Sequence, residues 1–74
     1  MRILFVCVHN SGRSQMAEAF TRLLSSGSID AISAGTRPGT TLNPTVVEVM
    51  KERGISLDGQ SPKVMTQAMV DNAD

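Results

Sequence analysis

The strongest constraint on the fold of this chain is an apolar run, Arg2–Val8, followed after only four residues by a helical pattern that starts at Arg13. After its first residue the run is β-branched, aromatic and otherwise apolar, which predicts a strand buried on both faces, as in parallel sheets. From Arg13 to Ser25 apolar residues recur at helical spacing and form one stripe. A buried strand that turns directly into a helix indicates an α/β unit.

The rest of the chain predicts a second strand and two more helices. In order, these are a weaker strand over Ile29–Ala34, a turn-rich loop over Gly35–Thr41, a helix from Pro44 to Gly54, an irregular stretch over Ile55–Lys63 and a short helix after Thr66. Asn43 is a suitable N-cap for the middle helix, and Thr66 is one for the last. No repeat or low-complexity segment interrupts this order.

The first helix is expected to bury its apolar stripe and to expose its charges. The stripe consists of Met16, Ala17, Phe20, Leu23 and Leu24. Glu18 and Arg22 are one turn apart, which predicts an ion pair on the exposed side. Gly27 is the expected stop signal, because glycine takes left-handed backbone angles at no steric cost.

The segment Cys7–Ser14 predicts a cradle for a tetrahedral oxyanion. The strand delivers the Cys7 thiol to the end of a sheet, and a turn before a helix directs N–H groups and the positive end of the helix dipole toward one point. The same field lowers a cysteine pKa, which predicts that Cys7 is a nucleophile. The alternative interpretation of Cys7 is a small buried hydrophobic residue at a strand end.

The other residues of the loop have predicted roles of different kinds. Arg13 carries a planar, permanently charged fork that grips two oxygens, and a cation at a helix N-terminus favours a bound anion. Ser14 is predicted to donate to the thiolate, with a plain helix-start residue as the equal alternative. Asn10 and Gly12 suit left-handed angles. The predicted oxyanion-binding residues are Val8, His9, Asn10, Ser11, Gly12 and Arg13.

Composition excludes several classes of partner. The formal net charge is zero and no basic block is present, which disfavours nucleic acid and anionic membranes. The apolar run at the start is too short to span a bilayer. One cysteine excludes an internal disulfide and fits a reducing cytoplasm, so we expect a cytoplasmic protein. A single histidine and cysteine without spaced carboxylates predict no metal site.

The residues resemble the low-molecular-weight phosphotyrosine phosphatase superfamily, and in particular its arsenate reductase branch. The likeness is carried by Val6–Glu18 and continues through Ser33–Gly35, Leu42–Pro44, Met50–Ile55 and Gln60–Lys63. It implies an α/β fold: the N-terminal part of a doubly wound, flavodoxin-like parallel sheet in the order strand, loop, helix, strand, helix, helix, ending before a third strand. Residues 1–74 are thus expected to form a single, incomplete phosphatase-like arsenate reductase domain.

The resemblance also implies a reaction. Cys7 attacks arsenate, Arg13 and the loop amides hold its oxygens, Ser14 tunes the thiolate and Asn10 stiffens the loop. A second thiol then attacks the Cys7–arsenic adduct and releases arsenite. No cofactor is implied; with one cysteine in these residues, the reductant is an external thiol: mycothiol, glutathione, or a thioredoxin- or glutaredoxin-type protein.

Two departures from the family keep alternatives open. Many relatives carry a second cysteine where this chain has Gly12, and the Asp-Pro that supplies the phosphatases' general acid does not occur here. The alternatives to a reductase are a truncated oxyanion-binding module and then a low-molecular-weight tyrosine phosphatase. The two-stranded sheet also predicts an unpaired edge, for which a homodimer is one remedy.

Overall fold

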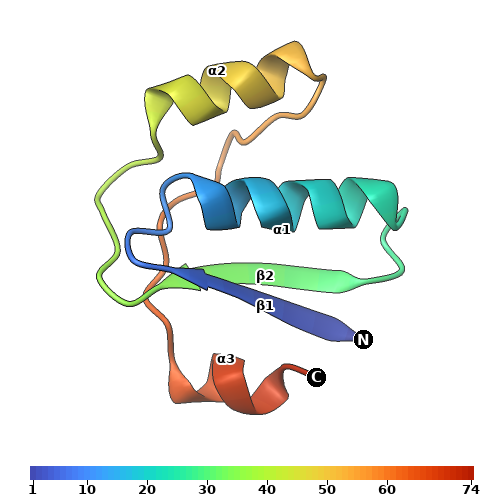
Figure 1. The fold of residues 1–74 in the computed structure, drawn as a ribbon, viewed down its shortest axis with the longest axis vertical. Coiled ribbons are helices and arrows are strands. Elements are labelled where there is room, and N and C mark those ends of the chain that lie inside the picture. Colours follow the sequence, from blue (N-terminus) through green and yellow to red (C-terminus); the bar gives the residue numbers. More distant parts are fainter.

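β1 (Arg2–Cys7) and β2 (Asp30–Gly35) form a two-stranded parallel sheet, and α1 (Arg13–Leu24) connects them. The computed structural model describes all 74 residues, and Figure 1 shows their arrangement. The register pairs Cys7 with Gly35, so both strands end at the same edge of the sheet. The predicted α/β class and the order of the elements are confirmed. The loops that follow the two strands therefore meet at one place.

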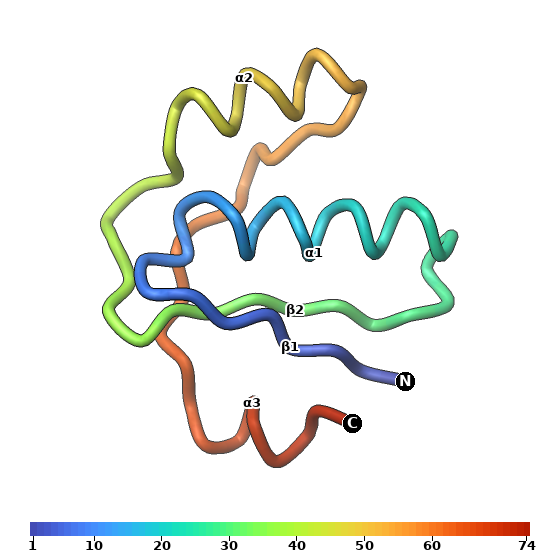
Figure 2. The backbone as a smooth tube through the Cα atoms, viewed as in Figure 1, coloured from blue at the N-terminus to red at the C-terminus, as the bar shows by residue number.

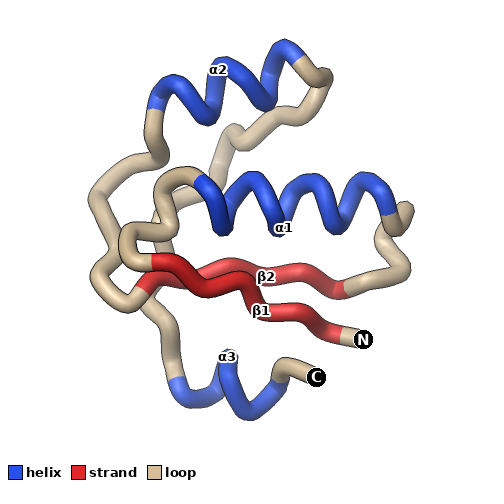
Figure 3. Tube along the Cα trace, in the orientation of Figure 1, coloured by secondary structure: helices blue, strands red, loops and turns tan.

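The helices lie in layers on either side of the sheet. α1 packs against both strands, and α3 (Gln67–Asn72) packs against β1 on the opposite face. α2 (Pro44–Glu52) lies beyond α1, away from the sheet. Figure 3 shows that loops make up most of the chain between α2 and α3. None of the helices combines the length and the apolar character that a membrane span requires.

Local signals place the ends of α2 and α3 as the sequence predicts. The Asn43 side chain accepts a hydrogen bond from the Thr45 N–H at 2.9 Å, and α2 begins at Pro44. Gly54 follows the helix with φ of 76°, in the left-handed region. The Thr66 hydroxyl accepts from the Met69 N–H at 3.2 Å and caps α3. These caps satisfy N–H groups that have no partner inside the helix.

The end of α1 differs from the prediction by one residue. Ser26, not Gly27, takes the first left-handed position, with φ of 54°. The Ser26 N–H donates to Leu23 O at 3.1 Å and the Gly27 N–H to Arg22 O at 3.0 Å. These two hydrogen bonds form a Schellman motif, which satisfies carbonyl groups at the helix end. A serine therefore occupies the position that favours glycine.

Two predictions that apolar side chains are buried are wrong. Val6 is 47% exposed, so β1 is not buried on both faces, because it has one neighbouring strand and α3 is only six residues long. Leu23 and Leu24 are 57% and 81% exposed and project from the last turn of α1, where no other element covers them. The apolar stripe of α1 therefore makes less of the core than its spacing predicts.

The buried interior is largely polar. Its apolar members are Ala31, Ala34, Met50 and Leu57, and its polar members are Asn10, Ser14, Gln15, Glu18 and Ser33. Three of the buried polar residues lie on α1 and one on β2, so a polar seam runs between this helix and the sheet. Burying such groups costs free energy unless they are hydrogen-bonded. This seam leads to the loop between β1 and α1.

Candidate functional site

Cys7 is the last residue of β1, and its sulfur lies at the start of the loop. The Ser14 Oγ is 2.8 Å from the sulfur, and the Asn10 N–H donates to it at 3.0 Å. Burial by itself raises the pKa of the Cys7 thiol. Hydrogen bonds from the Ser14 hydroxyl and from the amides of Asn10, Ser14 and His9 outweigh that effect and lower the pKa below its ordinary value.

The direction of the Ser14 hydrogen bond follows from its neighbour Asn10. The Asn10 Oδ1 accepts the backbone N–H of Lys63 at 2.8 Å, and a backbone donor fixes which side-chain atom is the oxygen. The Asn10 Nδ2 must then face Ser14, to whose Oγ it donates at 2.8 Å. Because this lone pair is used, the single hydroxyl hydrogen of Ser14 is free to point at the sulfur of Cys7. Ser14 thus acts as a donor that favours the thiolate.

The carbonyl groups of the loop are bonded to the surrounding chain. Cys7 O accepts from the N–H of Thr36 at 3.1 Å, Val8 O from Arg37 at 2.8 Å, His9 O from Gly39 at 3.0 Å and Ser11 O from Asn43 at 2.8 Å. A trans peptide unit directs its N–H opposite to its C=O. The amides of this segment therefore face the other side of the loop. Figure 2 shows the segment after β2 running alongside the loop at this end of the sheet.

Four amides of the loop donate to no protein atom. They belong to Val8, Ser11, Gly12 and Arg13. Together with the amides aimed at the Cys7 sulfur, they form a concave set of donors at the N-terminus of α1, and the helix dipole adds positive potential there. Such a set of donors suits the oxygens of a tetrahedral anion.

Gly35 allows the end of β2 to approach the loop. A Cβ at this position would lie 2.7 Å from Val8 O and 3.1 Å from both N and Cβ of Asn10. Contacts below 3.0 Å require the backbone to move. Asn10 itself has φ of 51° and is fully buried, so the turn depends on a residue that tolerates left-handed angles.

The remaining predicted site residues lie at the rim of the loop. Arg13 is exposed at the start of α1, and its side chain makes no ion pair or hydrogen bond with another residue. Val8 and His9 are exposed, and His9 Nδ1 lies 3.2 Å from Arg37 O. Gly12 faces α2, and a Cβ added at this position would lie 3.6 Å from a methyl group of Val46. The predicted residues therefore lie together along one turn.

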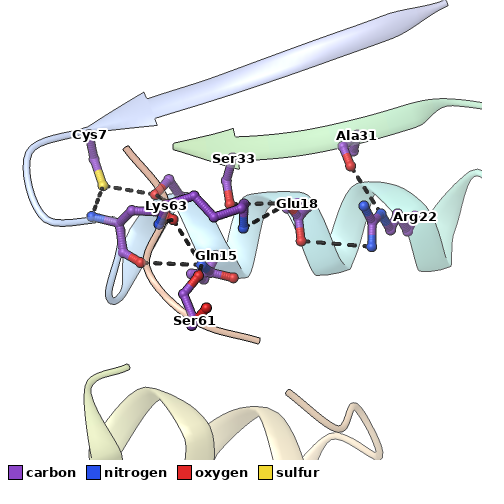
Figure 4. A network of polar contacts seen from close by, with 10 residues as sticks. Cys7, Gln15, Glu18, Arg22, Ala31, Ser33, Ser61 and Lys63 are labelled. Atoms are coloured by element: carbon purple, nitrogen blue, oxygen red, sulfur yellow. Dashed lines mark hydrogen bonds and ion pairs between the residues drawn. The ribbon is translucent and has the colours of Figure 1, made fainter. Parts of the chain in front are cut away.

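Sequence reasoning missed the residues that hold Asn10 in place. The Gln15 Nε2 donates to Asn10 O at 3.2 Å, to Asn10 Oδ1 at 3.0 Å and to Ser61 O at 3.2 Å. Figure 4 shows Gln15, Ser61 and Lys63 gathered at the Cys7 end of α1. The motifs around Gln15 and Lys63 carried the resemblance to a family, but local spacing assigns them no chemistry.

Glu18 is buried, which corrects the prediction that it lies on the exposed side of α1. Its side chain accepts a hydrogen bond from the Ser33 hydroxyl at 3.1 Å, and it is 3% exposed. Its carboxylate lies 3.9 Å from the Lys63 Nζ and 3.8 Å from Arg22 Nη1. The Lys63 contact comes from a segment distant in sequence, so the periodicity of α1 did not reveal it.

No group of three or more histidine, cysteine, aspartate or glutamate side chains is arranged to hold a metal ion. The larger hollows of the surface lie away from Cys7. One of about 490 Å³ is formed by α2 and the residues that follow it, Gly54–Asp58.

A family model described as low molecular weight phosphotyrosine protein phosphatase matches residues 2–74. The chain belongs to this family. One similar protein is the glutaredoxin arsenate reductase of Synechocystis sp. It is 37% identical to this chain over 73 residues, which cover 99% of this chain and 55% of that relative. The resemblance predicted from the motifs is confirmed.

Solved structures of this family share the fold. A thioredoxin-dependent arsenate reductase of Corynebacterium glutamicum has a TM-score of 0.94 and 37% identity, over 99% of this chain and 37% of that one. An arginine phosphatase of Geobacillus stearothermophilus has a TM-score of 0.86 and 30% identity, over 97% of this chain and 47% of that one. The chain spans about half the length of the curated relatives it matches.

Proposed function

We propose that this chain supplies the oxyanion-binding and nucleophilic site of an arsenate reductase. The observation that carries the proposal is a Cys7 sulfur that accepts hydrogen bonds from Ser14 and Asn10 beside unpartnered loop amides and the unpaired Arg13. Relatives named arsenate reductase, at 35% to 39% identity, support this choice of oxyanion. Arsenate is tetrahedral and anionic, as the concave set of amides requires.

The first step forms a bond between sulfur and arsenic. The Cys7 thiolate attacks arsenic(V), and the hydroxyl group of hydrogen arsenate takes a proton from solvent and leaves as water. The Arg13 guanidinium binds two of the remaining oxygens, and the amides of Val8, Ser11 and Gly12 stabilise their charge. Ser14 keeps the sulfur in its thiolate form before the attack.

In the second step arsenic gains two electrons while Cys7 and an external thiol are oxidised together to a disulfide. The external thiolate attacks the Cys7 sulfur, the electron pair of the sulfur–arsenic bond moves to arsenic, and arsenite leaves as arsenic(III). A disulfide between Cys7 and the reductant remains, and a second thiol reduces it. Cys7 is the only cysteine in the 74 residues, so the thiol that attacks it comes from outside them.

The names of the relatives favour a protein as reductant. One relative is called a glutaredoxin arsenate reductase, and one structural neighbour a thioredoxin-dependent arsenate reductase. We therefore propose a thioredoxin- or glutaredoxin-type partner, with mycothiol and glutathione as alternatives. Chemistry of this kind requires a reducing compartment such as the cytoplasm.

We also propose that residues 1–74 belong to one domain whose sheet is completed by further strands. β1 pairs only with β2, which leaves its other edge unpaired except where the Asp74 N–H donates to Arg2 O at 2.9 Å. A second copy of the chain is the alternative source of a strand, and it stays a prediction.

Phosphoester hydrolysis is the second candidate, since the arginine phosphatase neighbour shares the fold. The same cradle accepts phosphate, but hydrolysis also needs a general acid beside the leaving group. Asp30 and Asp74 both bond to Arg2, at the end of the sheet opposite Cys7. The names of the relatives favour arsenate over a phosphoester. An oxyanion-binding module without turnover is the third candidate.

The test measures arsenite formed from arsenate by the full protein, with thioredoxin, thioredoxin reductase and NADPH, and separately with glutaredoxin and glutathione. We expect arsenite with at least one system and none from Cys7→Ser. Hydrolysis of an aryl phosphate without arsenate reduction would assign the phosphatase. Protection of Cys7 from alkylation by arsenate, with neither turnover, would assign the binding module.

A further inference from the structure

We infer that Gln15 is a positioning residue for Cys7, acting through Asn10 and Ser14. Gln15 is the third residue of α1, makes no hydrogen bond to the sulfur, and is 0% exposed. The inference rests on the proposed nucleophilic role of Cys7. Neither the predicted site nor the proposed mechanism gives Gln15 a function.

The side chain of Gln15 is oriented by three acceptors. Asn10 O, Asn10 Oδ1 and Ser61 O all lie within 3.2 Å of one terminal atom of the amide. Carbonyl oxygens have no hydrogen to donate, so this atom must be the nitrogen, whose two hydrogens are shared among the three oxygens. A rotated amide would place an oxygen against three oxygens. The orientation is therefore unique.

These hydrogen bonds act on the two groups that Asn10 turns toward the thiol. The bond to Asn10 O holds the peptide in its left-handed conformation, from which the Asn10 N–H donates to Cys7 at 3.0 Å. The bond to Asn10 Oδ1 holds the side chain so that its Nδ2 faces Ser14. Gln15 thus supports both of the shortest contacts to the sulfur.

The third bond connects the site to the segment after α2. Ser61 O accepts from Gln15, and two residues later the Lys63 N–H donates to the Asn10 Oδ1 at 2.8 Å. In Figure 4 the segment passes beside Gln15 before it reaches Lys63. Gln15 therefore also positions the backbone donor that fixes the amide of Asn10.

The oxygen of the Gln15 amide shows that this arrangement does not maximise the stability of the fold. Its Oε1 is buried and accepts no hydrogen bond. Leaving a buried acceptor unsatisfied costs about 1–3 kcal/mol. Packing alone favours an apolar side chain of the same volume, whereas the donor role of Nε2 requires the amide. A cost of this kind points to a function for the residue.

The experiment compares Gln15→Met with Gln67→Met in the full protein. The first change removes the donor at similar volume, and the second makes the same change on exposed α3, where Gln67 bonds only to Asp71. The rate of Cys7 alkylation by iodoacetamide is measured against pH. We expect Gln15→Met to move the midpoint to higher pH and to slow alkylation at pH 6 about twofold to threefold, the effect of losing one hydrogen bond. Gln67→Met should leave both unchanged.

A double-mutant comparison separates positioning from general loosening of the fold. If Gln15 acts through Ser14, the shift caused by Gln15→Met should be smaller when Ser14 is already alanine. Gln15→Leu also removes the donor without adding a charge, and we expect it to raise the midpoint as well, which provides a second variant if Gln15→Met does not fold. A folded Gln15 variant with the wild-type pH midpoint would overturn the inference. Alkylation needs no arsenate, so the result stands apart from the outcome of the arsenate assay.

Discussion

Replacing Gly35 by alanine tests whether the end of β2 must touch the Cys7 loop. The added Cβ would lie 2.7 Å from Val8 O, and 3.1 Å from N and Cβ of Asn10. The first contact is too short by several tenths of an ångström, and the atoms involved are mainly backbone. Either the strand end or the loop must therefore move.

The expected cost follows from the contacts that such a movement disturbs. Overpacking of a filled site costs about 1–3 kcal/mol. The bonds from Thr36 N–H to Cys7 O and from Arg37 N–H to Val8 O lie directly beside Gly35, and weakening one of them costs about 0.5–1.5 kcal/mol. Gly35 does not have a positive φ, so alanine recovers about 0.4–1 kcal/mol by restricting the unfolded chain. We expect a net destabilisation of about 2 kcal/mol, and in any case between about 0.5 and 4 kcal/mol.

The assay is the free energy of unfolding in urea, together with the rate of Cys7 alkylation at neutral pH. Gly39→Ala is the matched control, because its Cβ would meet nothing closer than Thr41 O at 3.9 Å, and its φ is not positive. We expect this control to be as stable as the wild type or more stable by up to about 1 kcal/mol, because alanine restricts the unfolded chain here too. Equal stability and equal alkylation rates for the two variants would refute the argument from close approach.

Three further predictions concern other parts of the chain. Because the pKa of Cys7 is lowered in the folded state, the unfolded chain binds more protons between that pKa and the ordinary value. The free energy of unfolding in urea should therefore rise with pH across this window, and this contribution should be lost as pH falls through the folded pKa. Cys7→Ser should lack this pH-dependent contribution. Ser26→Gly should stabilise the chain by about 0.5–1 kcal/mol in thermal unfolding, since Ser26 has a left-handed φ; destabilisation would contradict this reading of the helix end. The free energy of unfolding in urea should be about 1–3 kcal/mol lower for Glu18→Leu than for Glu18→Gln, because only glutamine still accepts from the buried Ser33 hydroxyl. Equal free energies would mean that this hydrogen bond contributes nothing.

The secondary structure was predictable because its signals are local. α2 carries its cap and its stop within the sequence that forms it, Asn43 and Gly54, and β1 is a single uninterrupted apolar run. The predicted ends differ from the observed ones by one or two residues. The end of α1 was harder to place, since Ser26 takes a backbone angle for which its residue type gives no signal.

Burial was less predictable because it depends on partners far along the chain. A charge on a helix usually faces solvent, but Glu18 meets Ser33 from β2 and lies near Lys63. The segment that carries Lys63 has no regular structure of its own. Only the fold shows that it returns to α1.

The nucleophile is named by its motif, but its chemistry is set by segments outside that motif. A loop of eight residues does not hold its carbonyl groups outward by itself; four of them are bonded to residues 36–43. The amide orientation of Asn10 is also fixed from outside the motif, by the hydrogen bond from the Lys63 N–H. Each of these contacts closes a long loop of chain, and the entropy lost on closing it is offset by the interactions of the whole fold. The low pKa of Cys7 is therefore a property of the folded domain, not of the Cys7–Arg13 sequence.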